Sequence, residues 1–453
     1  MDVTTERIAA FVTELNDGQL SASALLQARR RLIDTVACAY GGCAGAPAEI
    51  ACRVAATAAS RPPARIWTTG AETSVEMAAF ANSVMVRYLD YNDTYISKGS
   101  GHPSDMIAAL LAVAEAQRCA GRALLTAIVV AYEVFTALAD AINLRDRGWD
   151  QGLFVVLGTA AGAAKLLGLT HAQTGDALAI AVSSNIASRQ TRSGELSMWK
   201  GCATAASARA GVFAATLAAN GMTGPTAAFE GKHGICDQVS GPFDLHSLGA
   251  QDGVYGIERT SLKLFPSEFH SQAPLALALQ LREKVGVADI TAIRVQTYHT
   301  CYSEIGSEPE KWNPQTRETA DHSLPYLLAV ALSDGFIDSG SFSTEKIRDP
   351  ALHSLMQRIS ISENADYTRE YPGRLVTQMA IETRDGRCLV ETAAYAKGHA
   401  KNPMTDDEID LKFNRLTEKY LSVVRRAKLL RQLRGIDACL DVGRLIDCMR
   451  IDA

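Results

Sequence analysis

The sequence lacks the short motifs with which many enzymes hold a nucleotide or a metal ion. It contains no Gly-x-Gly-x-x-Gly turn, no phosphate-binding P-loop, no Gly-x-Ser-x-Gly elbow and no His-Glu-x-x-His pair. Its ten cysteines are scattered without a Cys-x-x-Cys pair, which argues against structural zinc and iron–sulfur clusters. We therefore expect chemistry carried by acid–base side chains, with no cofactor and no metal.

The sequence also lacks long apolar runs and an excess of positive charge. Its apolar stretches are broken by polar residues before they reach about 18 continuous positions, so we expect no membrane span. The net charge of -5 provides no basic surface for nucleic acid. The first residues lack the basic-then-apolar order of a signal peptide, and scattered cysteines are typical of a reducing compartment. These absences predict a cytoplasmic protein without membrane or nucleic-acid partners.

What the sequence does have is 47% hydrophobic residues, arranged mostly at helical spacing. Ile8, Phe11, Val12 and Leu15, for example, form one apolar stripe of a helix. Later segments are rich in Ala and Leu with Gly between them, a composition that lets helices approach closely. The pattern predicts an all-helical bundle of at least eight helices, including those over residues 104–120, 123–143, 154–167, 172–186 and 202–220.

A second kind of region follows residue 221, where Gly, Pro and polar residues become more frequent. Residues 290–298 read as a strand, and residues 375–395 read as a hairpin that turns at Asp385-Gly386. The fold class we predict is mainly α with a second, smaller α+β domain. The helical domain covers residues 1–264, the α+β domain is inserted at 265–400, and helices in 401–453 return to the helical domain.

Residues 87–105 carry an unusual density of reactive side chains. Asp90, Asp93, Thr94 and His102 lie within about a dozen positions, between two helical patterns. Pro103 and the N-cap candidate Ser104 predict that a helix begins directly after His102. The positive end of a helix dipole disfavours an imidazolium and favours a bound carboxylate, so a neutral His102 is a candidate general base or acid. The alternative is an ordinary polar loop with capping residues.

Lys200 lies near the start of the predicted helix at 202–220, where the dipole makes a cation less favourable than an acid. This position makes sense if an anion lies between the lysine and the helix. The alternative, which this observation alone favours, is a solvated surface lysine.

Five segments in order resemble the MmgE/PrpD family, and together they span nearly the whole chain. The first is the loop at 87–105. The others are Met198-Trp199-Lys200, the Lys263-Leu264-Phe265-Pro266 segment with His270, the Ala320-Asp321-His322-Ser323 segment with Tyr326, and the Tyr395-Ala396-Lys397-Gly398-His399 segment with Lys412-Phe413.

This resemblance implies a helical domain built from both chain ends, an inserted α+β domain, a cleft between them, and a homodimer. It also implies cofactor-independent chemistry on a small di- or tricarboxylate substrate. The reactions are dehydration of 2-methylcitrate, decarboxylation of cis-aconitate or epimerisation of iminodisuccinate. Each requires a group that moves a proton at a carbon beside a carboxylate, and cations that stabilise the resulting anion. A non-catalytic carboxylate-binding dimer is the alternative outside enzyme chemistry.

The resemblance also implies roles for individual residues. His102 is the leading proton-transfer candidate. Lys200 and Lys263 would bind substrate carboxylates and stabilise charge, or one of them could donate a proton if burial lowers its pKa. His270 and Tyr326 could orient the substrate or relay a proton. The long spacer between Thr94 and His102 resembles the 2-methylcitrate dehydratase branch. The expected catalytic set is His102, Lys200, Lys263, Tyr326 and Asp90, and the expected substrate-binding set is Thr94, Asp93, His270 and His322, with His322 equally open to a structural capping role.

Overall fold

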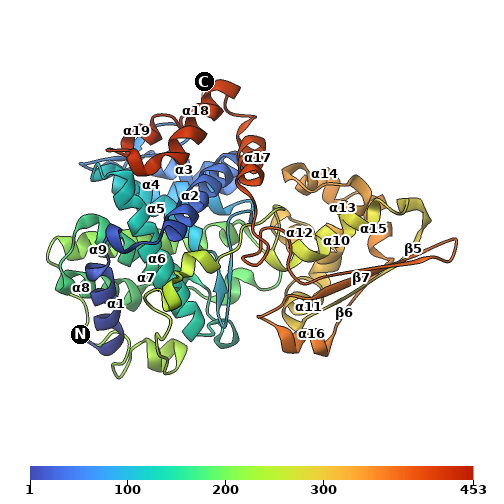
Figure 1. The fold of residues 1–453 in the computed structure, drawn as a ribbon, viewed down its shortest axis with the longest axis horizontal. Coiled ribbons are helices and arrows are strands. Elements are labelled where there is room, and N and C mark those ends of the chain that lie inside the picture. The colour runs from blue at the N-terminus through green and yellow to red at the C-terminus, as the bar shows by residue number, and fades with distance from the viewer. Residues whose placement is uncertain (452–453) are drawn as a thin grey trace.

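The computed structural model describes residues 1–451 and divides them between a large helical region and a smaller region that contains a sheet (Figure 1). The helical region holds the two ends of the chain, and the smaller region lies between them in sequence. The predicted fold class, mainly α with a smaller α+β part, is confirmed.

The helices of the large region coincide with the apolar stripes of the sequence, with ends that differ by a few residues. They are α1 (Val3–Glu14), α2 (Ala22–Gly42), α3 (Ala46–Ala55), α4 (Val75–Arg87), α5 (Ile107–Ala116), α6 (Gly121–Ala141), α7 (Gly152–Leu167), α8 (His171–Ser184), α9 (Ala203–Ala219), α17 (Asp406–Thr417), α18 (Val423–Arg434) and α19 (Gly443–Ile446). Two short hairpins accompany them: β1 (Ala64–Arg65) with β2 (Glu72–Thr73), and β3 (Tyr95–Ile96) with β4 (Ser100–Gly101).

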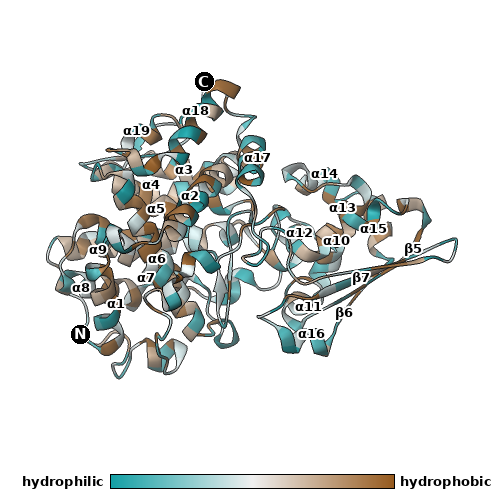
Figure 2. Ribbon diagram, in the orientation of Figure 1, coloured by the Kyte–Doolittle hydropathy of each residue, from teal (hydrophilic) through white to brown (hydrophobic). Residues whose placement is uncertain are grey.

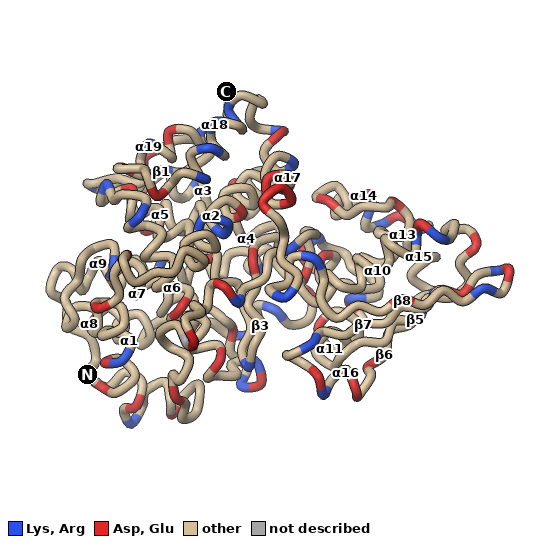
Figure 3. The backbone as a smooth tube through the Cα atoms, viewed as in Figure 1, with Lys and Arg blue, Asp and Glu red and all other residues tan. Residues whose placement is uncertain are grey.

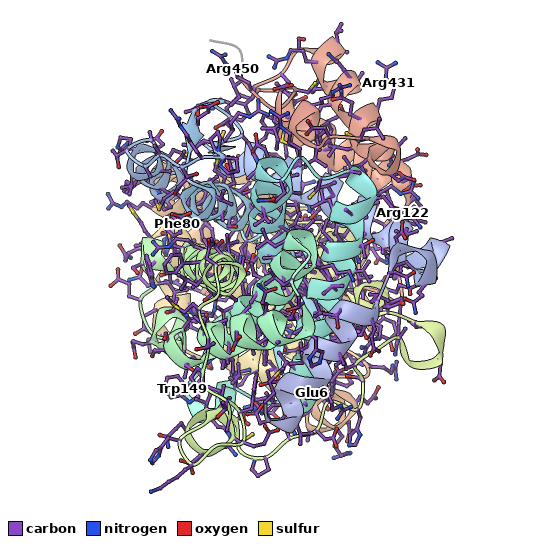
Figure 4. The ribbon with its side chains drawn as sticks, turned by 90° about the vertical axis from the view of Figure 1, so that its left-hand side faces the viewer. Glu6, Phe80, Arg122, Trp149, Arg431 and Arg450 are labelled. Carbon is purple, nitrogen blue, oxygen red and sulfur yellow. The ribbon has the colours of Figure 1, made fainter. Side chains whose placement is uncertain are left out.

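Helix α6 forms the centre of this region. It is long and apolar enough to cross a membrane by length and composition, which differs from the expectation that no such stretch exists. However, 89% of its most apolar window is buried among the surrounding helices, as expected for a core helix. Apolar residues concentrate on these inner helices in Figure 2. Figure 4 shows charged side chains such as Arg122 and Arg431 toward the edge of the helical region.

Small residues set how closely the helices pack. A Cβ on Gly42, at the end of α2, would lie 2.1 Å from the carbonyl oxygen of Met85 in α4. Such an overlap with backbone cannot be relieved by a rotamer change, so the α2–α4 contact requires glycine at this position. This contact matters for the site because α4 leads directly into the loop that begins at Arg87.

The smaller region is built on a four-stranded sheet in the order β6-β5-β7-β8. Strand β5 (Ile290–Thr297) and the hairpin of β7 (Thr377–Thr383) and β8 (Cys388–Ala393) match the predictions. The hairpin turns through Gly386 at φ 84°. Strand β6 (Ile359–Glu363), which pairs parallel to β5, was not predicted, because it is a short edge strand with mostly exposed side chains and little alternation.

Helix α10 packs on β7 and β8 and α11 contacts β6, whereas β8 has no fully buried residue. The apolar side chains of the region form a cluster of their own, separate from the cluster of the helical region. The helices are α10 (Gln272–Arg282), α11 (His299–Ile305), α12 (Arg317–Ala320), α13 (Leu324–Asp334), α14 (Thr344–Ile347), α15 (Pro350–Met356) and α16 (Ala365–Glu370).

The C-terminal helices lie against the helical region, with α17 packed on α2. The acidic first turn of α17, visible in Figure 3, suits the positive end of its dipole and pairs with Arg30 of α2 and Arg434 of α18. The backbone N–H of Gly121 donates to the Cys439 carbonyl over 2.8 Å, so the C-terminal segment also contacts the start of α6. The boundaries 1–264, 265–400 and 401–453 themselves stay a prediction.

Candidate active site

A cavity of about 360 Å³ lies where the two regions meet, and both contribute side chains to its wall. Most of the reactive groups come from loops between helices. Those from the helical region include Arg87, Asp90, Thr94, His102, Arg145 and Arg189, and those from the smaller region include Glu268, His270, Glu304, His322 and Tyr371.

The loop after α4 brings Asp90 to the centre of this wall. Helix α4 ends at Arg87, and the Asp90 N–H donates to the Arg87 carbonyl over 3.1 Å. Asp90 has a φ of 50°, in the left-handed region that few residues other than Gly, Asn and Asp occupy. This conformation turns the chain back, so that the Asp90 carboxylate points at the cations around it instead of continuing the helix.

Asp90 is surrounded by three buried cations. Its Oδ1 accepts from Lys263 Nζ and from the Arg87 guanidinium, each at 2.5 Å, and its Oδ2 lies 3.3 Å from Lys200 Nζ. These positive charges outweigh burial and hold the pKa of Asp90 well below its usual range. The two lysines were expected to bind substrate carboxylates and to stabilise charge. They are 2% and 0% exposed and lie behind Asp90, outside the cavity lining, which leaves them the role of stabilising charge.

A second buried carboxylate, Asp321, extends this network. Its Oδ1 accepts from Lys200 Nζ over 2.7 Å and lies 2.6 Å from His322 Nδ1. The neighbouring cations lower the pKa of Asp321 to about 2, so the carboxylate accepts and His322 donates from Nδ1. Burial and Lys200 lower the pKa of His322 to about 4. The His322 ring is therefore neutral, and its unprotonated Nε2 lies 3.6 Å from Asp90 Oδ2.

Asp90, Asp321 and His322 are close enough together to form a metal-ligand group. The ammonium of Lys200, however, already lies between the two carboxylates, at 3.3 Å from one and 2.7 Å from the other. Because this lysine supplies the positive charge that both carboxylates require, we assign the group to an ion-pair network and not to a metal site.

His102 is the residue best placed to act as a base. Its Nδ1 lies 2.7 Å from the Asp93 carbonyl oxygen, which can only accept, so Nδ1 carries the proton and Nε2 has a free lone pair. Burial and the charges of Arg87 and Lys263 hold its pKa well below the usual value of 6.5. The His102 backbone N–H donates to Gln151 Oε1 over 2.5 Å, which fixes His102 beside the start of α7. His102 is thus a neutral, anchored base that lines the cavity.

Asp93 and Thr94 hold this histidine in place. Asp93 is fully buried; Oδ1 accepts from the Ser104 N–H at 2.9 Å and Oδ2 from the Tyr132 hydroxyl at 2.8 Å. Ser104 was expected to be the N-cap, but it lies inside the 3-10 turn η2 (Pro103–Met106), whose N-cap position is His102, and the Asp93 carboxylate accepts its N–H. The α-helix itself begins only at Ile107. Thr94 Oγ1 lies 3.2 Å from His102 Nδ1 and lines the cavity, whereas Asp93 does not.

The remaining expected residues divide between the cavity and the core. His270 lines the cavity, and its Nδ1 lies 2.6 Å from the Tyr298 hydroxyl. Tyr326 was expected in the catalytic set, but the structure places it in the core of the smaller region, where its hydroxyl donates to the Ser341 carbonyl over 2.6 Å. The sequence places Tyr326 on a helix beside the Asp321-His322 motif. It does not reveal whether the Tyr326 ring faces the cavity or the core, so the ring was expected in the site.

Several cavity residues were not predicted at all. Arg145 and Arg189 both pair with Glu304 of α11, across the junction of the two regions. Arg192 pairs with Asp150 over 2.7 Å. These residues lie in polar loops far apart in sequence, without a local pattern that marks them. Glu268, in contrast, lies inside the segment from Lys263 to His270 and could have been singled out there.

Comparison with known families confirms the resemblance seen in the sequence. The MmgE/PrpD N-terminal domain matches residues 6–248, and the MmgE/PrpD C-terminal domain matches residues 265–435. These two matches cover all the cavity residues named above, and Lys263, behind Asp90, falls between them.

Individual relatives are similar over most of their length. A 2-methylcitrate dehydratase of Salmonella typhi is 29% identical over 408 residues, which cover 84% of this chain and 82% of that protein. A 2-methylcitrate dehydratase of Cupriavidus necator is 29% identical over 411 residues with the same coverage. The human cis-aconitate decarboxylase is 24% identical over 455 residues, 96% of this chain and 92% of that protein. The chain thus belongs to the MmgE/PrpD family.

Proposed function

We propose that this chain is a cofactor-independent hydro-lyase that removes water from 2-methylcitrate, a hydroxy-tricarboxylate, to give 2-methylaconitate. The observation that carries this proposal is His102, a neutral imidazole whose free Nε2 lies in the wall of a cavity rich in cations. The dehydratases of similar sequence support the choice of substrate.

In this reaction a C–H bond beside a carboxylate breaks, and its electron pair becomes the new C=C bond as the neighbouring C–O bond breaks. His102 Nε2 takes the proton, because its Nδ1–H stays bonded to the Asp93 carbonyl. The imidazolium that forms has Asp90 Oδ1 at 3.9 Å, and this ionised carboxylate stabilises the new charge. Asp90 therefore assists the proton transfer without itself exchanging a proton.

Negative charge develops on the substrate carboxylate next to the carbon that loses its proton. Cations in the cavity wall offset this charge and bind the other carboxylates. Arg145 and Arg189 share one carboxylate, Glu304, so this group keeps an excess positive charge that faces the cavity. Lys200 and Lys263 act from behind Asp90, by keeping it ionised and fixed. In this proposal Thr94, His270 and His322 contact the substrate.

The second candidate is decarboxylation of cis-aconitate, because a decarboxylase of that substrate is similar over 96% of this chain. The same histidine and cations would serve this reaction, with carbon dioxide in place of water as the product. Measured carbon dioxide release from cis-aconitate, together with no reaction of 2-methylcitrate, would favour the decarboxylase.

The decisive experiment is an ultraviolet time course with purified protein, a chelator and a stereoisomer mixture of 2-methylcitrate. We expect the absorbance of a conjugated alkene to grow without added metal. The His102→Ala variant should lose roughly 10²–10⁴-fold in kcat, the usual contribution of a general base, with an unchanged melting temperature. His171→Ala, at a partly exposed position on α8, is the matched control. Near-normal turnover by His102→Ala would contradict the assignment.

We also propose that the chain works as a homodimer in the cytoplasm. Its ten cysteines are all free thiols, which suits a reducing compartment. Helix α3 and the 3-10 turn η5 (Met198–Gly201), which contact each other, expose four large apolar side chains. Ile50, Val54, Met198 and Trp199 are each between 45% and 53% exposed. Such a group of apolar side chains is typical of a subunit interface, and a second copy of the chain is the occupant we propose.

A further inference from the structure

Elimination of water needs a proton donor as well as a base, because hydroxide is a poor leaving group. Resting on the function proposed above, we propose that Glu268 is this donor: its carboxylic acid protonates the departing hydroxyl while His102 removes the carbon-bound proton. Glu268 belongs to the segment between Lys263 and the 3-10 turn η9 (Phe269–Ser271), and it lines the cavity together with His102 and His270.

The position of Glu268 differs from that of the other carboxyl groups in the cavity wall, apart from the exposed Asp146. Asp90, Asp150 and Glu304 each form an ion pair with at least one arginine or lysine. Glu268 has no such partner within 4.0 Å among residues 1–451, and the one basic side chain within that distance is His270, whose Nε2 lies 3.9 Å from Oε1. The absence of a paired cation removes the main reason for a buried carboxyl to ionise.

The surroundings of Glu268 therefore favour its neutral form. Burial, together with the negative charges of Asp90 and Glu304, raises its pKa to about 8, although the positive charge of Lys263 acts in the opposite direction. His270, the remaining titratable neighbour, is uncharged, since burial lowers its pKa to about 3. At neutral pH the site thus combines an acid that holds its proton with a base, His102, that lacks one, which is the combination that elimination requires.

Hydrogen bonds orient the acid. Oε2 accepts from the His270 backbone N–H over 2.6 Å, so the transferable proton belongs on Oε1. The buried Tyr298 hydroxyl has His270 Nδ1 as its one hydrogen-bond partner within the described chain, at 2.6 Å. A hydroxyl with a single partner is best satisfied as the donor, which leaves the His270 proton on Nε2, facing Glu268 Oε1. His270 and Tyr298 are thus positioning residues, and the Nε2–H would stabilise the carboxylate formed after proton transfer.

The atoms and electrons of this step balance without a further reactant. The C–H electron pair forms the C=C bond, the C–O electron pair leaves with oxygen, and the Glu268 proton converts that oxygen into water. The enzyme is left with an imidazolium at His102 and a carboxylate at Glu268. Return of one proton from the first to the second through solvent restores the starting state.

The test compares Glu268→Gln, Glu268→Asp and His102→Ala on two substrates. One is 2-methylcitrate, and the other is an analogue with fluorine in place of the tertiary hydroxyl, whose leaving group depends less on protonation. Glu268→Gln should lose roughly 10²-fold or more in kcat on 2-methylcitrate but much less on the fluoro analogue. Glu268→Asp should keep part of the activity, and His102→Ala should lose turnover of both substrates. Glu345→Gln, exposed on α14, is the control.

The pH dependence provides a second readout. In the wild type kcat/KM should fall as the pH rises through about 8, because Glu268 then loses its proton, and this limb should be absent from the residual activity of Glu268→Gln. Equal loss on both substrates by Glu268→Gln, or an alkaline limb that persists in this variant, would overturn the proposal.

A measurement without substrate separates this inference from the proposed function. A carboxyl with a raised pKa destabilises the fold progressively as the pH rises from its unfolded value, 4.5, to about 8. The melting temperature of Glu268→Gln relative to wild type should therefore increase from pH 5 to pH 8. Lack of turnover by wild type would refute the dehydratase alone, whereas a melting-temperature difference that does not change with pH would refute the protonated Glu268.

Discussion

Asp90 is the single residue on which most of the site depends. It accepts from Arg87 and Lys263, lies 3.3 Å from Lys200, and has the imidazoles of His102 and His322 within 4 Å. Three buried cations around one carboxylate are stable only while that carboxylate is charged and fixed. The left-handed backbone at φ 50° is maintained by these contacts, since the isolated loop would gain nothing from it.

We predict that Asp90→Asn destabilises the protein by about 3–5 kcal/mol, the usual cost of leaving a buried cation without its partner, and abolishes turnover. The loss should be similar at pH 7 and pH 5. The pKa of Asp90 is lower in the folded state than in the unfolded chain, where it is 3.8. The ionised carboxylate therefore contributes fully to the free energy of unfolding above pH 3.8, and this contribution is lost only as the pH falls below that value. Urea unfolding at both pH values measures the loss, with Asp366→Asn in an exposed pair as control. A loss under 1 kcal/mol would contradict this account.

At the scale of elements, helix α17 supports the loop after α4, which lies more than 300 residues earlier in the sequence. Lys412 Nζ donates to the Tyr91 carbonyl at 2.8 Å and to the Lys263 carbonyl at 3.1 Å, and it pairs with Asp34 of α2 at 2.6 Å. It also lies over the Tyr91 ring, 3.8 Å from its centroid. One ammonium thus joins α17, α2, the loop after α4 and the segment that carries Lys263.

Replacement of Lys412 by Met should cost about 3–5 kcal/mol, because Asp34, which is 2% exposed, would keep its charge without a partner. The kcat should fall as well, since the loop that positions Asp90 and His102 loses its support. Denaturant unfolding and the dehydration assay test the two effects. Lys428→Met, at an exposed position on α18, should change neither. An unaltered kcat in Lys412→Met would mean that the loop is held by its other contacts.

At the scale of the whole molecule, the cavity exists only where the helical region and the sheet region meet. His102 and Asp90 come from the first, and Glu268, His270 and His322 from the second. The ion pairs of Arg145 and Arg189 with Glu304 join the two regions beside the cavity. Neither region alone has both the neutral base and the carboxyl that we propose as its partner acid.

The proposed homodimer is also a property of the whole molecule. We predict that sedimentation of the wild type gives twice the mass of one chain, and that Val54→Glu shifts the protein toward monomer by placing a charge in the apolar group on α3. Phe336→Glu, which adds the same charge at a 55% exposed position of the smaller region, should leave the mass unchanged. A wild-type mass of one chain would refute the dimer.

Much of this organisation could be predicted from the sequence. Apolar spacing located the helices of the large region, and alternation located β5 and the β7–β8 hairpin, because both signals come from neighbouring residues on one face of one element. The density of reactive groups at 87–105 singled out Asp90, Thr94 and His102, all of which line the cavity. Strand β6 was missed because an exposed edge strand carries little of that local signal.

Only the tertiary structure decided how the reactive groups divide their tasks. Lys200 and Lys263 were expected to bind substrate carboxylates and stabilise charge, but they lie behind Asp90. Tyr326 was expected in the site, but it lies in the core of the smaller region. The proton on Glu268 and the free Nε2 of His102 depend on burial and on charges that come from distant segments. A sequence determines which side chains an element carries, whereas pKa values and contacts depend on what the folded chain places beside them.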